Sequence, residues 1–107
     1  MNSEPQLHQV DVLVIGAGAA GLTAALSVPE HLSVAILTKD PSGGSTRWAQ
    51  GGVAAVIDGE DSVESHVQDT LIVGAGLCHQ DIVEHVVSNA RGAIDWLIKK
   101  DCKMVVV

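Results

Sequence analysis

The sequence predicts an α/β fold, a parallel β-α-β unit followed by helices. Three observations lead to this prediction. A short apolar run at residues 12–15 stops at a glycine, and a helical stretch then leads to a second apolar run at residues 33–38. Farther along, apolar residues recur at helical spacing. Two strands joined through a helix pair in parallel with a right-handed crossover, so the chain begins like a doubly wound domain.

The first strand ends in the pattern G-x-G-x-x-G, formed by Gly16, Gly18 and Gly21. In such a pattern the first glycine makes the tight turn, the second lets the backbone approach a pyrophosphate, and the third lets helix and strand pack closely. The helix that follows directs free N–H groups and its positive dipole end at bound phosphate. The pattern therefore predicts a Rossmann-like nucleotide site, with Ala17, Ala19 and Ala20 between the glycines.

The uncharged stretch from Val12 to Val28 also has to be weighed as a membrane span or signal-peptide core. It is slightly too short for a span and holds three glycines. No basic segment precedes it, and Pro29-Glu30-His31 follows in place of a small-residue cleavage site. We therefore expect neither membrane insertion nor export.

Length and charge limit the remaining classes. The 107 residues suffice for one domain, and 47% hydrophobic content suffices for a core. The net charge of −7 argues against nucleic acid and anionic membranes as partners, because both are polyanions. Small anionic ligands stay possible, since helix N-termini and local cations bind them.

Cysteines and histidines are scattered along the chain. Cys78 and Cys102 form no C-x-x-C pair, which favours reduced thiols in a cytoplasmic protein. No two histidines have the i+3 or i+4 spacing of a helical metal site, and we expect no metal. The five histidines are His8, His31, His66, His79 and His85.

The second strand ends unusually for a dinucleotide fold. An acidic side chain normally binds the ribose about 20 residues after the glycines, but Thr38 and Lys39 stand there. Threonine can hydrogen-bond a ribose, and lysine can contact phosphate or stay solvated. Asp40 lies slightly too far along the sequence to take the place of the missing acidic residue.

A loop rich in glycine and hydroxyl groups follows at residues 41–46 and leads through residues 47–50 to Gly51 and Gly52. It is either an ordinary turn or a second backbone cradle. In the second case Ser45 and Thr46 lie near phosphate, and the backbone from Gln50 to Gly52 lies against a flat ring. Residues 53–57 are predicted to form a short strand.

These motifs, in this order, resemble the FAD-binding N-terminus of the succinate dehydrogenase, fumarate reductase and L-aspartate oxidase group. The resemblance extends from about Asp11 to Ile98. That group commonly has a hydroxyl residue and lysine where other flavoproteins place glutamate. The resemblance implies FAD as cofactor, bound by Gly16, Ala17, Gly18, Ala19, Ala20, Gly21, Thr38, Lys39, Ser45, Thr46, Arg47, Trp48, Ala49, Gln50, Gly51 and Gly52.

The residue at position 45 distinguishes between two branches of this group. The respiratory members carry a histidine just before the loop threonine, covalently joined to FAD, and serine cannot form that bond. Together with residues 74–78, Gly-Ala-Gly-Leu-Cys, this looks more like the oxidase branch with noncovalent FAD. The branch implies oxidation of L-aspartate to iminoaspartate in NAD biosynthesis, with oxygen or fumarate as acceptor. A succinate or fumarate flavoprotein and a non-catalytic remnant are the alternatives.

Two helices are predicted after the loop. Asp61 is a cap residue with Glu64 three positions later, and Val63, Val67 and Leu71 then follow on one face. His66 lies off that stripe and is predicted to be a hydrogen-bonded surface or interface side chain rather than a catalytic one. The second helix begins near Asp81 and ends at two lysines, with the apolar positions Ile82, Val83, Val86, Val87, Ala90, Ile94, Leu97 and Ile98.

The two ends of the chain carry no recognised motif. We expect residues 1–9 to be disordered, and residues 101–107 depart from the family pattern. The chain therefore reads as the N-terminal part, residues 1–107, of an FAD-binding domain, a fragment without catalytic residues of its own and inactive alone. Nothing in the sequence indicates an oligomeric state.

Overall fold

The computed structural model describes residues 3–40, 42–49 and 51–101. Contacts divide the chain into two compact units, residues 1–52 and 53–107, called here the N-terminal and C-terminal units. The prediction for Gln50 and the departure at residues 102–107 fall outside the described residues. Residues 3–10 form neither helix nor strand. No helix of the described part of the chain is long and apolar enough to cross a membrane.

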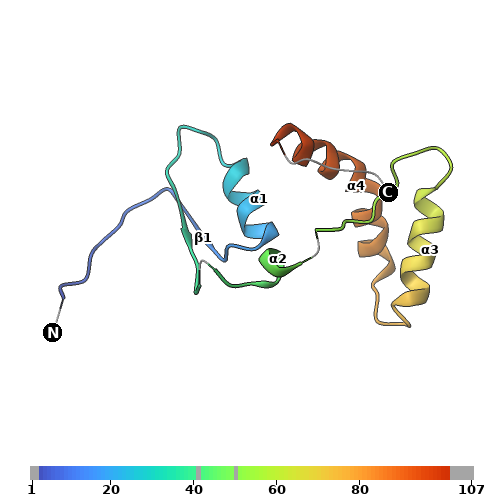
Figure 1. The fold of residues 1–107 in the computed structure, drawn as a ribbon, viewed down its shortest axis with the longest axis horizontal. Coiled ribbons are helices and arrows are strands. Elements are labelled where there is room, and N and C mark those ends of the chain that lie inside the picture. The colour runs from blue at the N-terminus through green and yellow to red at the C-terminus, as the bar shows by residue number, and fades with distance from the viewer. Residues whose placement is uncertain (1–2, 41, 50, 102–107) are drawn as a thin grey trace. The chain divides into compact units, whose positions relative to one another are not determined.

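The N-terminal unit contains the predicted parallel β-α-β (Figure 1). Strand β1 (Val12–Ile15) pairs with β2 (Val34–Leu37), and helix α1 (Ala19–Ser27) connects them. In register, Val12 lies beside Val34 and Ile15 beside Leu37. Helix α1 ends before Pro29, as predicted, because proline has no N–H to donate and restricts the residue before it. This part of the fold prediction is confirmed.

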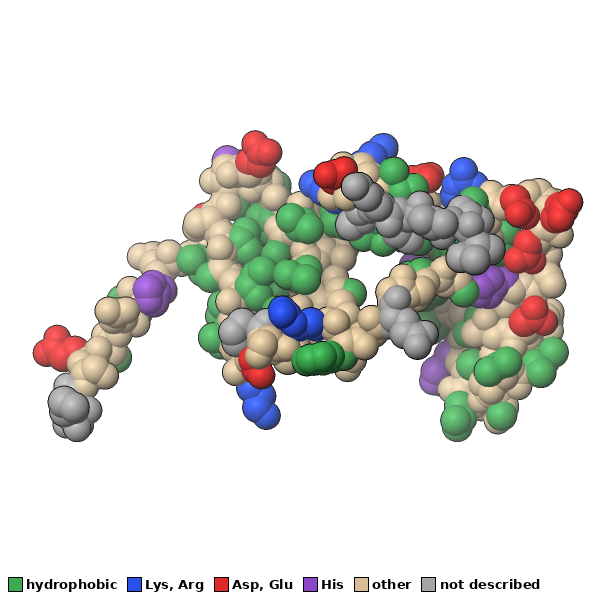
Figure 2. All heavy atoms as spheres, viewed as in Figure 1, with side chains coloured by type: hydrophobic (Ala, Val, Ile, Leu, Met, Phe, Trp, Pro, Cys, Tyr) green, Lys and Arg blue, Asp and Glu red, His purple; other side chains and the backbone are tan. Residues whose placement is uncertain are grey.

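Only one face of the two-stranded sheet is covered by α1. A Cβ atom on Gly21 would lie 3.4 Å from Cγ1 of Val14, which places α1 over the Val14 face. Side chains alternate along a strand, so Leu13 and Ile15 belong to the opposite face, where they are 56% and 78% exposed. Hydrophobic side chains are accordingly visible on the surface of this unit (Figure 2).

Two local predictions were wrong. A single helical turn, α2 (Ser45–Trp48), interrupts the stretch predicted to be loop. Residues 53–57, predicted to be a strand, form none. A strand needs a neighbour for its backbone groups, and within the described residues the carbonyl of Ile57 instead accepts a hydrogen bond of 2.6 Å from Nη1 of Arg91.

The C-terminal unit is a pair of packed helices, α3 (Val63–Val73) and α4 (Gln80–Lys99). The predicted cap was off by one residue. Ser62 caps α3 by accepting a 3.0 Å hydrogen bond from the Ser65 backbone N–H, whereas Asp61 accepts from the backbone N–H of Ser62. Serine and aspartate both serve as N-caps, so the sequence alone did not separate these neighbours.

The predicted helical stripes provide the core of the C-terminal unit. Val67 of α3 is buried, as are Val87 and Ile94 of α4. Other positions of the α4 stripe, including Ile82, Val86 and Ile98, stay more than half exposed, because the packed face of this helix pair is narrower than the stripe.

Candidate functional site

The turn after β1 places three glycines in different surroundings. Gly16 has φ = +112°, which disfavours a side chain, and its N–H donates to the Leu37 carbonyl at 2.8 Å. A Cβ atom on Gly21 would overlap the Gly16 carbonyl oxygen. At Gly18, by contrast, a Cβ atom would meet only Thr46 Oγ1, at 3.5 Å. Gly16 and Gly21 are therefore required by the turn itself, whereas the protein has room for a side chain at Gly18.

Helix α1 begins at this turn with Gly18 as its N-cap. Glycine has no side chain to accept the first helical N–H groups, which are left for other acceptors. The Ala19 N–H finds one in Thr46 Oγ1, at 3.1 Å. The Leu22 N–H already bonds the Gly18 carbonyl within the helix, at 2.9 Å. A helix end of this kind binds anions through its N–H groups and dipole.

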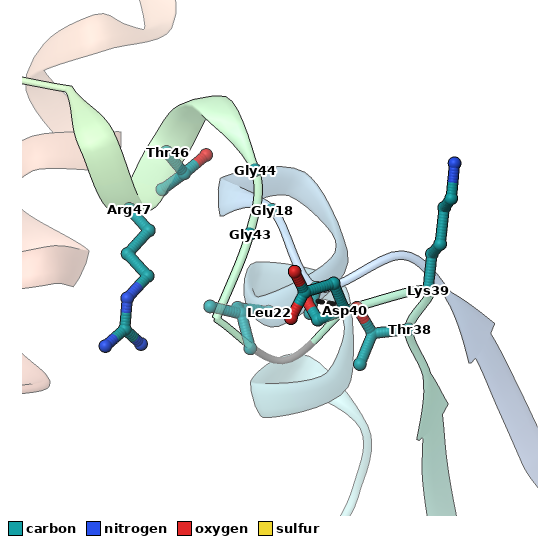
Figure 3. A pocket seen from close by; sticks show the side chains of 10 residues that line it. Gly18, Leu22, Thr38, Lys39, Asp40, Gly43, Gly44, Thr46 and Arg47 are labelled. Carbon is teal, nitrogen blue, oxygen red and sulfur yellow. Dashed lines mark hydrogen bonds between the residues drawn. The ribbon is translucent and has the colours of Figure 1, made fainter.

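A cavity of about 570 Å³ lies beside this helix end, between the turn after β1 and residues 38–47 (Figure 3). This volume is within the range of small-molecule sites. Six of the residues predicted from the sequence line it: Ala17, Gly18, Thr38, Lys39, Thr46 and Arg47. Segments about 20 residues apart in sequence thus come together on one side of the β-α-β unit, as the motif predicts.

The other predicted residues lie outside the lining of this cavity. Gly16, Ala19, Ala20 and Gly21 build the turn and the first helical residues behind it. Ser45, Trp48, Ala49, Gly51 and Gly52 are not among the lining residues either. The Trp48 side chain is 78% exposed. For these nine residues a role in cofactor binding stays a prediction.

The cavity also includes four residues that the prediction did not contain, Leu22, Asp40, Gly43 and Gly44. Asp40 is held in the loop by Ser42, whose backbone N–H and Oγ donate to Oδ1 at 2.8 and 2.7 Å. These bonds, the side-chain one foremost, lower the pKa of Asp40. The D-x-S spacing is typical of such a turn and could have marked this loop. Gly44, at φ = +99°, then starts α2.

The lining of the cavity has more basic than acidic side chains, although the net charge of the chain is −7. Nine of the thirteen acidic residues belong to residues 53–107, and acidic side chains are spread over the surface of the C-terminal unit in Figure 2. The cavity has two cations, Lys39 and Arg47, and one acid, Asp40. The Lys39 side chain extends away from the other labelled side chains (Figure 3).

His66 lies in the C-terminal unit, in a shallower hollow of about 370 Å³ lined also by Asp61, Asp69, Thr70 and Val73. The hollow holds no cysteine or lysine, and the Thr70 hydroxyl donates to the His66 carbonyl at 2.8 Å.

Comparison with known proteins identifies the family of the chain. Residues 11–106 match the family model described as an FAD binding domain. The chain belongs to the FAD-binding domain family. Two relatives, both named L-aspartate oxidase, come from Pseudomonas aeruginosa (60% identical over 96 residues) and Vibrio cholerae (54% over 99 residues). The matches cover 89% and 92% of this chain and 18% of each relative, so the chain spans about a fifth of their length.

The described residues fit the dinucleotide part of FAD. The glycine turn exposes backbone where a diphosphate can approach, the start of α1 supplies N–H donors, and Lys39 and Arg47 supply positive charge. When bound, FAD supplies the redox chemistry of such proteins, and the polypeptide holds and orients it.

Proposed function

We propose that this chain forms the first part of the FAD site of an L-aspartate oxidase, an enzyme that converts L-aspartate to iminoaspartate with oxygen or fumarate as acceptor and so begins NAD biosynthesis. The observation that carries the proposal is the 60% identity to a protein of that name over 89% of this chain. The cavity beside the glycine turn supports it, because its cations and helix end suit a diphosphate.

Within this proposal FAD is bound without a covalent link. Ser45 stands where the respiratory flavoproteins carry the histidine that bonds the flavin, and a serine hydroxyl cannot form a histidyl bond. We also include a cytoplasmic location, because the two cysteines are far apart in sequence and suit reduced thiols. Nucleic acid is not among the proposed partners.

The groups that hold L-aspartate are proposed to lie in the part of the relatives that this chain does not match. A dicarboxylate is usually held by converging arginines, and the sequence has two, Arg47 and Arg91. Arg91 is already engaged, since its Nη1 donates to the Ile57 carbonyl and its Nε lies 3.5 Å from Asp95 Oδ1. We therefore expect the 107-residue chain with FAD to show no turnover of L-aspartate.

The proposal is tested by exchanging residues 11–101 into the Pseudomonas aeruginosa relative at the matching positions. We expect the exchanged enzyme to keep L-aspartate-dependent peroxide formation within about tenfold of its parent and to show no activity with succinate. Acid precipitation should release all yellow colour into the supernatant. Colour retained by the precipitate, or preferential oxidation of succinate, would instead favour a respiratory-type flavoprotein.

A matched pair of variants tests the site itself. Gly18→Val puts a branched side chain into the cavity, where the protein has room but a diphosphate would collide with it. Gly59→Val adds the same group in the C-terminal unit, where no atom lies within 4 Å of the added Cβ. Fluorescence titration of the 107-residue chain with FAD should show binding by the native chain and by Gly59→Val, and none by Gly18→Val. Equal affinity in all three would contradict the proposed site.

A further inference from the structure

One hydrogen bond joins the two walls of the cavity. The Ala19 N–H at the start of α1 donates to Thr46 Oγ1 in α2, at 3.1 Å, across 27 residues of sequence. Within the described part of the chain, no other hydrogen bond ties residues 44–49 to the β-α-β segment. In Figure 3 the Thr46 side chain lies close to Gly18 and Gly44.

The position of this bond matters because of what each wall contributes. Gly18 and Leu22 line the cavity from α1, whereas Gly43, Gly44 and Arg47 line it from the loop and α2. The loop begins its turn at a glycine with φ = +99° and continues into a helix of only four residues. So short a helix is not stable by itself, so its place against α1 depends on contacts such as this one.

We propose that Thr46 is a positioning residue. Its hydrogen bond to the Ala19 N–H, called here the latch, holds residues 44–49 against the N-terminus of α1 before the cofactor binds. The inference rests on the proposed FAD site and adds the means by which that site is preorganised. A binding site whose loop is already ordered loses less conformational entropy when the ligand binds. The hydroxyl also caps a helix whose own N-cap, Gly18, has no side chain to do so.

Three variants separate the hydroxyl from the shape of the side chain. Thr46→Val keeps the branched shape and removes the acceptor. Thr46→Ser keeps the acceptor and removes the methyl group. Ser27→Ala removes a hydroxyl in the last turn of α1, outside the cavity lining, where it donates to the Thr23 carbonyl within the helix, and serves as the control. Far-UV circular dichroism of all three, without ligand, checks that the β-α-β unit and the helices are intact.

Two readouts are then taken on the 107-residue chain. We expect Thr46→Val to raise the Kd for FAD about three- to tenfold, the equivalent of one net hydrogen bond, while Thr46→Ser and Ser27→Ala stay within about twofold of the native chain. Without ligand, hydrogen exchange of residues 44–49 should become faster in Thr46→Val alone, and saturating FAD should restore most of the protection.

Each other outcome has a definite meaning. Tighter FAD binding by Thr46→Val would overturn the latch, because the hydroxyl would then be competing with phosphate for the Ala19 N–H. An unchanged Kd together with unchanged exchange would overturn it as well. If the native chain itself binds no FAD, the proposed function fails, and the latch as a preorganising device fails with it. The unliganded exchange data show separately whether the hydroxyl orders residues 44–49.

Discussion

In the C-terminal unit Val67, Val87 and Ile94 are buried, whereas no described side chain of the N-terminal unit is. The N-terminal unit is instead joined by hydrogen bonds between distant residues, such as Gly16 to Leu37, and by one close backbone contact at Gly21. The cavity predicted to bind the cofactor belongs to this unit. The glycine motif therefore specifies a backbone shape beside the cavity, whereas the helical stripes specify a core.

Each unit has one tryptophan, which allows the comparison to be tested unit by unit. Trp48 is in α2 of the N-terminal unit, and Trp96 is in α4 of the C-terminal unit. In a Trp96→Phe background, fluorescence reports on the first unit, and in a Trp48→Phe background it reports on the second.

The largest effect is expected at Gly21. Gly21→Ala places a methyl group against the Gly16 carbonyl oxygen, which is backbone and cannot move aside without opening the turn. We expect a loss of FAD binding and a destabilisation of the N-terminal unit by about 3 kcal/mol, the upper end for overpacking. Chemical unfolding followed through Trp48 measures it.

Gly92 provides the control within a helix. A Cβ atom there meets nothing within 4 Å, so Gly92→Ala should stabilise α4 by about 1 kcal/mol, because glycine is a poor helix former. If Gly21→Ala and Gly92→Ala destabilised their units by similar amounts, glycine would have the same role in both units. The proposed difference between the units would then be wrong.

The next effect is expected in the helical core. Ile94→Ala removes one of the buried side chains and should destabilise the C-terminal unit by about 2–3 kcal/mol, since it leaves a cavity. Val86→Ala, at a side chain that is 59% exposed, should cost less than about 1 kcal/mol. Both are measured through Trp96. An equal shift in the Trp48 signal would show that the N-terminal unit depends on the same core.

A smaller effect is expected at the cap of α3. Ser62→Ala removes the acceptor of the Ser65 N–H and should destabilise the C-terminal unit by about 1 kcal/mol. Ser88→Ala, at an exposed position inside α4, should be neutral or slightly stabilising because alanine favours helix. Asp61→Ala should have less effect than Ser62→Ala; the reverse order would restore Asp61 as the cap.

The smallest effect is expected at Asp11, which links the starts of the two strands. Its Oδ2 accepts hydrogen bonds from the Ser33 N–H and Oγ, both at 2.8 Å, and these bonds, the backbone one foremost, lower the pKa of Asp11. A lowered folded-state pKa means that this contribution is present above the ordinary pKa of aspartate and is lost as pH falls through the folded value.

Asp11→Asn should therefore lower the stability of the N-terminal unit modestly at pH 7, where the carboxylate contributes, and remove part of the further loss below about pH 4. Thermal unfolding through Trp48 between pH 2.5 and 7 measures it, and Glu30→Gln provides the control for a charge change. An acid dependence identical to that of the native chain would exclude Asp11 as its source.

Much of the fold could be predicted because its signals are local. The G-x-G-x-x-G turn, the apolar runs and Pro29 define β1, α1 and β2, and helical spacing defines α3 and α4. The strand predicted at residues 53–57 failed because strand formation depends on a partner, and apolar composition gives no information about whether one is present.

The site was predicted in part for the same reason. Residues adjoining the glycine turn and the end of β2 were found from their distance along the sequence. Gly43 and Gly44 line the cavity because of how the loop folds back, which spacing does not reveal. Leu22 lines it from α1, one helical turn after Gly18. The bond between Ala19 and Thr46 joins two segments that sequence patterns treat separately.

The parallel register of β1 and β2 also has a consequence for the order of folding. Every strand partner lies 22 residues away in sequence, as Val12 does from Val34, whereas α3 and α4 are joined by a short connection at residues 74–79. Bringing distant residues together costs loop-closure entropy before any contact compensates for it. The helix pair, although synthesised second, is therefore expected to fold first in a refolding chain, and the β-α-β unit is expected to form later.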